Sequence, residues 1–106
     1  MSVAKYTTPT FVLTFNSQKF PELDLTQANN VYVTIKSGVY VLTKTGVDLD
    51  VNKNDISVFL SQEETSNLQV GTMEIQANWT LGNGERAASE KCSLEITDNL
   101  LKQVVE

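Results

Sequence analysis

Apolar and polar residues alternate with a period of two along most of this chain, as they do in half-buried β-strands. The longest run is 72–81, where every second residue is apolar: Met73, Ile75, Ala77, Trp79 and Leu81. Shorter runs of the same kind cover 10–15, 31–36, 39–44, 47–51 and 56–60. With a return strand after residue 81, the pattern predicts about seven short strands separated by turns.

The strongest turn signal follows the longest run. Asn83-Gly84 is a preferred pair for a two-residue type I′ turn, because both positions require a positive φ. A two-residue loop at this place also fixes the register of the hairpin. The apolar residues of its two strands coincide in that register, which predicts three cross-strand pairs: Trp79 with Ala88, Ile75 with Cys92, and Met73 with Leu94.

Ser37-Gly38 predicts a second tight turn, with 39–44 as the returning strand. In that arrangement Tyr32 and Tyr40 both face away from the valine side of their strands. Two exposed tyrosines would form a binding patch, whereas buried ones would pack under the loop 16–30 or under a C-terminal helix. The pattern leaves both interpretations open.

Two short segments carry helical signals. Ser61, followed three residues later by Glu64, forms a capping box that predicts one helical turn ending before Gly71. Near the C-terminus, Asp98 can cap a helix whose apolar residues share one face: Leu100, Leu101, Val104 and Val105. Because so short a helix is unstable alone, we expect it to dock on the sheet.

These elements predict an all-β fold: an immunoglobulin-like antiparallel β-sandwich of about seven strands with a short C-terminal helix. We expect a single domain over residues 1–106, with Trp79 in its core. A small β-barrel is the alternative. The cysteine pair that joins the two sheets of antibody domains is absent, because Cys92 is the only cysteine.

The chain is acidic, with 13 Asp and Glu against 8 Lys and Arg and a net charge of −5. Such a charge repels phosphates, so we expect no nucleic-acid partner. No stretch approaches the ~18 apolar residues of a membrane-spanning helix, and the first ten residues lack the apolar segment of a signal peptide. We therefore expect no membrane association, and synthesis in the cytoplasm.

Candidate catalytic residues are few. Histidine is absent, which removes the commonest general base and metal ligand and, with them, Ser-His-Asp and Cys-His mechanisms. Cys92 lies on the predicted inward face, where a thiol packs as a small hydrophobic group. Glu63 and Glu64 are neighbours on a helix and point in different directions. We therefore predict no enzyme activity, no catalytic residues and no cofactor-binding residues.

The segment 48–55 resembles a calcium loop in its spacing of Asp48, Asp50 and Asp55. An EF-hand loop needs Gly at its sixth position and Glu at its twelfth. Counted from Asp48, those positions hold Lys53 and Phe59. The mismatch predicts a solvated strand face that leads into a turn, with no metal-binding residues. A weak calcium site of another type is the alternative.

Three groups of short motifs stand out beyond these patterns. They are Thr8-Pro9-Thr10 with Asp24-Leu25-Thr26; Leu42-Thr43-Lys44 with Ile56-Ser57-Val58 and Leu60-Ser61-Gln62-Glu63-Glu64-Thr65; and Glu74-Ile75-Gln76-Ala77-Asn78-Trp79 with Ala88-Ser89-Glu90. Together they resemble small phage or prophage proteins of Gram-positive bacteria, akin to the N-terminal domains of upper baseplate proteins. The resemblance covers nearly the whole chain and implies a β-sandwich tail or baseplate component.

The function that this resemblance implies is a structural one, exercised through protein–protein contacts in a tail or baseplate assembly. Its partners would be phage structural proteins, further copies of this chain included, and its destination the virion. The alternative is a carbohydrate- or ligand-binding β-sandwich, with Trp79 or the tyrosines as a sugar platform. The strand 10–15 is the candidate contact. It carries no charge, and an edge strand without charges offers its unpaired backbone groups to a neighbour.

Overall fold

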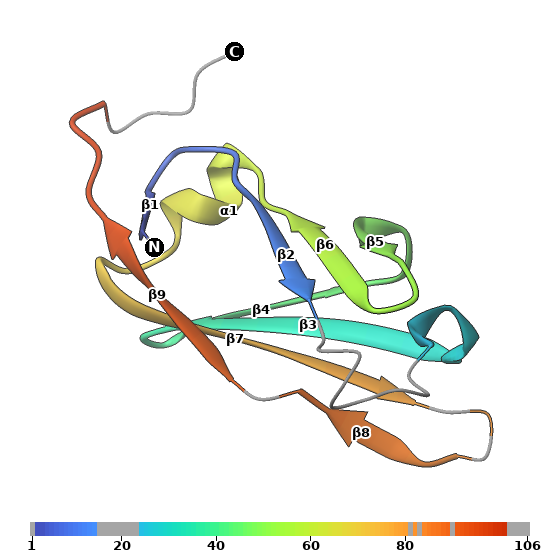
Figure 1. Ribbon diagram of the computed structural model, residues 1–106. Helices are drawn as coiled ribbons and strands as arrows, with labels where there is room; N and C mark the ends of the chain where they lie inside the picture. The colour runs from blue at the N-terminus through green and yellow to red at the C-terminus, as the bar shows by residue number, and fades with distance from the viewer. Residues whose placement is uncertain (1, 15–23, 81, 83, 90, 102–106) are drawn as a thin grey trace.

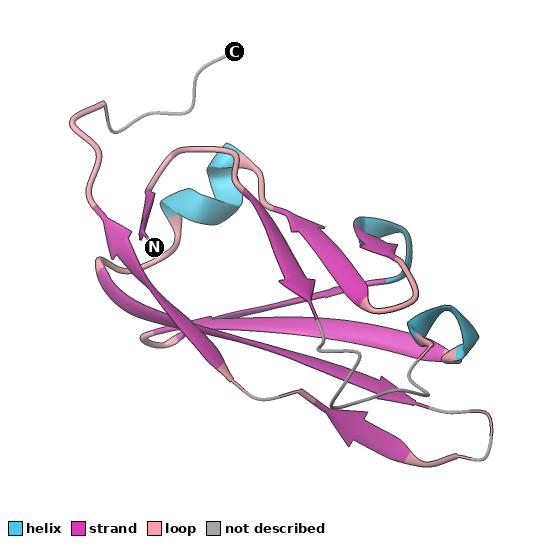
Figure 2. Ribbon diagram, in the orientation of Figure 1, coloured by secondary structure: helices cyan, strands magenta, loops and turns pink. Residues whose placement is uncertain are grey.

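A computed structural model describes residues 2–14, 24–80, 82, 84–89 and 91–101. Strands dominate these residues (Figure 2), as the period-two pattern predicts. The described residues contain more strands than the seven expected: β1 (Ser2–Ala4), β2 (Thr10–Thr14), β3 (Asn30–Ser37), β4 (Tyr40–Thr45), β5 (Leu49–Val51), β6 (Asp55–Phe59), β7 (Gly71–Thr80), β8 (Arg86–Ala88) and β9 (Cys92–Thr97). Between them lie two 3-10 turns, η1 (Leu25–Gln27) and η2 (Gly46–Asp48), and one helix, α1 (Gln62–Ser66).

The strands form two sheets (Figure 1). The larger sheet has the order β1-β9-β7-β3-β4, and β8 also pairs with β7; the smaller sheet has the order β2-β6-β5. β1 runs parallel to β9, and the other pairs are antiparallel. The fold is therefore mostly β, as predicted, with a mixed larger sheet. No helix in the described residues is long and apolar enough to cross a membrane.

The inward faces of the two sheets share one hydrophobic core. It contains Val31, Val33, Ile35, Met73, Ile75, Ala77 and Trp79 from the larger sheet and Phe11, Ile56 and Val58 from the smaller. Trp79 is only 5% exposed, which confirms its predicted place in the core. Leu60 and Leu68 flank α1 and are buried in the same cluster. The alternation of apolar residues on β3, β6 and β7 accounts for most of this packing.

The register predicted for the long hairpin is correct at one end and wrong at the other. Ile75 pairs with Cys92 and Met73 with Leu94, as predicted. Trp79, however, pairs with Ala87 and not with Ala88. The segment between β8 and β9 holds one residue more than the facing part of β7, so the pairing shifts by one position there. Such an extra residue is a β-bulge. Because Thr80 pairs with Arg86, the shifted register also excludes the predicted two-residue loop between β7 and β8.

Ser89 anchors this bulge to β7. Its amide donates to the carbonyl oxygen of Ala77 at 2.9 Å, and its Oγ accepts from the amide of Ala77, also at 2.9 Å. The Gln76 side chain donates to the carbonyl oxygen of Ser89 at 2.8 Å. Two predicted residues of the hairpin, Leu81 and Asn83, lie outside the described residues.

The turn between β3 and β4 is also displaced by one residue from its prediction. Ser37 pairs with Tyr40, so the two loop residues are Gly38 and Val39. Gly38 has a φ of 60°, a conformation that glycine adopts without strain. The shift reverses the faces of the returning strand. Tyr40 packs against the core, whereas Val41, which was expected inside, is exposed.

The predicted capping box at α1 is confirmed. The amide of Glu64 donates to Ser61 Oγ at 3.2 Å, and the amide of Ser61 donates to Glu64 Oε1 at 2.9 Å. Thr65, fully buried in the same helix, donates from Oγ1 to the carbonyl oxygen of Thr7 at 2.8 Å. This bond ties the helix to the segment that connects β1 and β2.

The predicted C-terminal helix does not begin at Asp98. Asp98 and Asn99 have no regular secondary structure, and Leu100 and Leu101 form a bend with exposed side chains. Side-chain oxygens take up the local amides instead, because Asn99 Oδ1 accepts from the amide of Leu101 at 3.1 Å. Asn and Asp often compete with helix formation in this way. The rest of the predicted helix, 102–106, lies outside the described residues.

Candidate functional site

Cys92 is exposed, so its prediction as a buried core thiol is wrong. Its partner across the sheet, Ile75, is buried, and the register between them is as predicted. The difference lies in what covers each residue. On the other side of β9, β1 pairs only with Glu95, Ile96 and Thr97. Cys92 therefore lies at the start of a strand that is flanked there by β7 alone among the described elements.

The acidic run 48–55 is divided among three elements. Asp48 belongs to η2 and Asp50 to β5, both with exposed side chains, while Asp55 begins β6. Asp55 Oδ1 accepts from the side-chain amide of Asn52 at 2.7 Å across the turn. No group of three potential metal ligands occurs within the described ranges of the chain. The arrangement matches the predicted strand face that leads into a turn.

Glu64 has a structural partner. Its carboxylate forms an ion pair with Lys44 of β4, and both side chains are largely buried. Burial by itself raises the pKa of Glu64, but hydrogen bonds from Lys44 and the Ser61 amide, together with the charge of Lys44, bring that pKa below its ordinary value. The neighbouring carboxylate, Glu63, is exposed. The two acids therefore differ in their surroundings. Glu64 ties α1 to the edge strand of the larger sheet through Lys44, whereas Glu63 faces solvent.

The two tyrosines lie on opposite faces of the larger sheet. Tyr40 is directed to the core, while Tyr32 lies on the outer face opposite Asn78. Of the two arrangements that the sequence left open, the patch of two exposed tyrosines therefore does not occur. Tyr32 remains half-buried and available to an outer pocket.

The strand expected to act as a contact, β2, does lie at an edge. It pairs with β6 and is the first strand of the smaller sheet among the described residues. Its side chains alternate as predicted, with Phe11 buried and Thr10, Val12 and Thr14 exposed. Phe15, included in the predicted strand, lies outside the described residues.

One side of the β2 backbone has no strand partner among the described residues. The amide of Leu60 donates to the carbonyl oxygen of Pro9 at 3.1 Å. In an antiparallel pair the hydrogen-bonded positions alternate, so Phe11 and Leu13 direct their N–H and C=O groups to β6. The corresponding groups of Thr10, Val12 and Thr14 point away from β6, toward the edge.

Two apolar side chains are exposed beside this edge. Val12 is 57% exposed and Phe59 of β6 is 53% exposed. Thr10 pairs with Phe59 and Val12 with Ser57, which makes Val12 and Phe59 diagonal neighbours on the outer face of the smaller sheet. Phe59 was not among the residues predicted to form a contact. The alternation along the strand nevertheless indicates its exposure, because Phe59 falls between the inward positions Ile56, Val58 and Leu60 and so lies on the outer face.

Comparison with known proteins adds no further assignment, because no family model and no curated protein matches the chain.

Proposed function

We propose that this chain is a non-enzymatic structural protein of phage origin, which acts by protein–protein contacts in a tail or baseplate assembly. The resemblance of its short motifs supports the phage origin. The observation that supports action by contact is the uncharged edge of β2, with Val12 and Phe59 exposed beside it. A soluble protein ordinarily protects such an edge with charges or prolines unless it uses the edge.

The strand order supports an immunoglobulin-like sandwich as the fold of this component. Immunoglobulin domains place strands B, E and D next to one another in one sheet and C, F and G in the other, to which variable-type domains add C′. If β2 is B and β3 is C, then β2-β6-β5 reads B-E-D and β9-β7-β3-β4 reads G-F-C-C′. The proposed fold differs from that of antibody domains in having no disulfide between the sheets.

The proposed partner at the β2 edge is a second copy of this chain. The exposed residues of β2 read Thr10-Val12-Thr14, which is symmetric about Val12. Two such strands related by a two-fold axis would pair Val12 with Val12 and Thr10 with Thr14. These are the residues whose N–H and C=O groups point to the open side, so each pair would exchange two hydrogen bonds. Cross-strand Thr pairs are also favourable.

A contact of this kind is small. One five-residue edge buries less than the ~1,200 Å² of a standard interface. We therefore expect weak self-association, with a Kd of roughly 10–100 μM. In an assembly, many copies held at fixed positions would compensate for the weakness of each contact.

Light scattering across a concentration series tests this contact. The native protein should show reversible dimerisation. Val12→Lys should raise the Kd at least ~10-fold, since two like charges would lie directly opposite each other. Val41→Lys is the matched control, because Val41 lies on the edge strand β4 of the other sheet and is 56% exposed, close to the 57% of Val12. A strictly monomeric native protein, or an equal effect of both substitutions, contradicts the proposal.

A cysteine crosslink tests the register. Directly opposite residues in a hydrogen-bonded antiparallel pair have Cα atoms about 5.5 Å apart, within the range of a disulfide. Val12→Cys in a Cys92→Ser background should therefore form a disulfide-linked dimer under mild oxidation. Val41→Cys in the same background should remain monomeric. Failure of Val12→Cys to crosslink in a protein that does dimerise would place the contact elsewhere.

The phage assignment has its own test. The genes next to the one that encodes this chain should encode tail, baseplate or lysis proteins. A neighbourhood of unrelated metabolic genes would refute the phage origin while leaving the β2 contact intact.

A further inference from the structure

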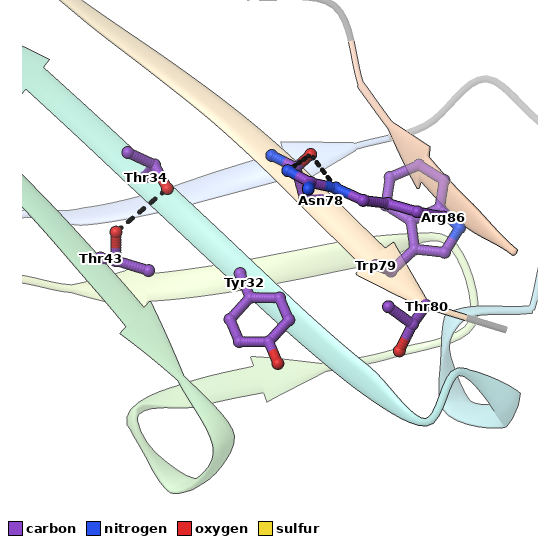
Figure 3. Close-up of a pocket in the computed structure, with 7 residues that line it drawn as sticks. All are labelled: Tyr32, Thr34, Thr43, Asn78, Trp79, Thr80 and Arg86. Carbon is purple, nitrogen blue, oxygen red and sulfur yellow. Dashed lines mark hydrogen bonds between the residues drawn. The ribbon is translucent and has the colours of Figure 1, made fainter. Parts of the chain in front are cut away.

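A shallow pocket of about 380 Å³ opens on the larger sheet (Figure 3). Four neighbouring strands line it: β3 with Tyr32 and Thr34, β4 with Thr43, β7 with Asn78, Trp79 and Thr80, and β8 with Arg86. Trp79 is the lining residue that also belongs to the core. The others alternate with core residues along their strands and so occupy the outer face.

Cross-strand pairing fixes the positions of these side chains. Tyr32 lies opposite Asn78, and Thr80 lies opposite Arg86. Thr34 lies opposite Thr43, and their hydroxyl oxygens are 3.2 Å apart, within hydrogen-bond distance. A pocket built from paired strand positions keeps its geometry without a loop having to close. Such preformed pockets are typical of ligand sites.

Arg86 is held in place at one side of the pocket. Its Nη2 donates to Asn78 Oδ1 at 3.1 Å and its Nε to the same oxygen at 3.4 Å. Figure 3 shows the Arg86 side chain reaching across to Asn78, with Tyr32 on the neighbouring strand β3. A guanidinium carries five N–H donors in a fixed plane, and the two bonds to Asn78 use one donor on Nε and one on Nη2.

The lining has a distinct chemical character. It combines two aromatic side chains, a guanidinium, a primary amide and three threonine hydroxyls. Among the seven lining residues, Arg86 carries the one charge and none is Asp or Glu. Arg86 is therefore the one charged group in a lining whose other polar groups are neutral.

We propose that this pocket binds an acidic saccharide, such as a uronic acid. The ring of Tyr32 offers an apolar surface with a polar tip for the face of a sugar. The threonine hydroxyls and Asn78 match sugar hydroxyls, which both donate and accept. The carboxylate of the sugar pairs with Arg86, whose planar donors suit a carboxylate. The site is independent of the β2 contact, because β2 belongs to the other sheet.

Amide chemical shifts measured by NMR test this inference on the whole chain. The probes are glucuronate, glucose, glucosamine and acetate, each titrated to about 50 mM. Glucuronate should shift amides of the lining residues with a Kd of ~1–10 mM. Glucose should bind the same residues at least ~5-fold more weakly, because it lacks the carboxylate. Glucosamine, with its positive charge, and acetate, with no ring, should bind more weakly still.

Three variants assign the roles. Arg86→Gln should remove the preference for glucuronate over glucose, and Tyr32→Ala should abolish the shifts caused by both sugars. Lys36→Gln is the matched control for the loss of a positive charge, since Lys36 is exposed on β3 outside the pocket lining. It should leave glucuronate binding unchanged. Circular dichroism confirms that each variant is folded.

Four results would overturn the inference. One is the absence of shifts at the lining residues with glucuronate. Another is equal binding of acetate, which indicates a simple anion site. A third is binding of glucosamine as tight as that of glucuronate, and the last is an equal loss of affinity in Lys36→Gln and Arg86→Gln.

Discussion

Replacement of Trp79 by alanine tests the core on which both sheets depend. Trp79 is 5% exposed and pairs across the sheet with Val31 and Ala87. A buried tryptophan removes about 150–250 Å² from water. At about 25 cal/mol per Å², the area lost on truncation to alanine corresponds to roughly 3–5 kcal/mol. Measured truncations of buried aromatic residues fall in the same range.

Such a loss is large for a chain of this size. A stability of roughly 5–15 kcal/mol is usual for single domains, so Trp79→Ala would remove about a fifth of it or more. The melting temperature should fall by about 12–40 °C, since each kcal/mol corresponds to about 4–8 °C in a domain of this length. The urea midpoint should fall by about 2–4 M.

Urea unfolding followed by far-UV circular dichroism measures this effect in both proteins. The fluorescence of the native protein provides a second readout, because Trp79 is its only tryptophan. Its emission should shift to longer wavelength on unfolding. Tyr32→Ala is the internal control, since Tyr32 is half-buried on the outer face of the neighbouring strand. We expect that control to cost less than ~1.5 kcal/mol.

A cost below ~1 kcal/mol for Trp79→Ala, or one no larger than that of Tyr32→Ala, would contradict the burial of the indole in the core. Either result would mean that the indole is exposed. It would then favour Trp79 itself as a sugar platform.

Three further perturbations test separate parts of the structure. Gly38→Ala should cost ~1–2 kcal/mol in urea melts, because Gly38 has a φ of 60°. A Cβ at this position would also meet the side chain of Gln69. The added substitution Gln69→Ala should therefore recover only part of the lost stability, since it removes the contact but not the backbone strain. Glu64→Gln should lower stability at pH 7, because the pKa of Glu64 is lowered in the folded state. That difference in stability should shrink as the pH falls through the lowered pKa of the folded state, and a difference of equal size at neutral and at strongly acidic pH would contradict it. Millimolar calcium should leave the melting temperature nearly unchanged, whereas a rise of several degrees that is lost in Asp50→Asn would reveal a calcium site.

Local sequence signals account for much of this fold. The alternation in 72–81 identifies β7 and its core face, because side chains of a strand point to alternate sides. Ser61 and Glu64 identify the start of α1, because a capping box is formed by residues within one turn. Thr10, Val12 and Thr14 mark an uncharged strand whose exposed face is visible in the pattern alone. Each of these signals depends on neighbours in the chain.

Strand register, burial and the outer pocket depend on residues that are far apart in the sequence, so only the tertiary structure decided them. The bulge at Ser89 shifts Trp79 from Ala88 to Ala87, and the turn at Gly38 and Val39 reverses the faces of β4. A change of one position exchanges the two faces of a strand, and no local pattern distinguishes the two registers. Cys92 was misplaced because burial depends on which elements cover a strand. For the same reason only the assembled sheet, which brings Tyr32 beside Asn78 and Arg86, reveals the outer pocket.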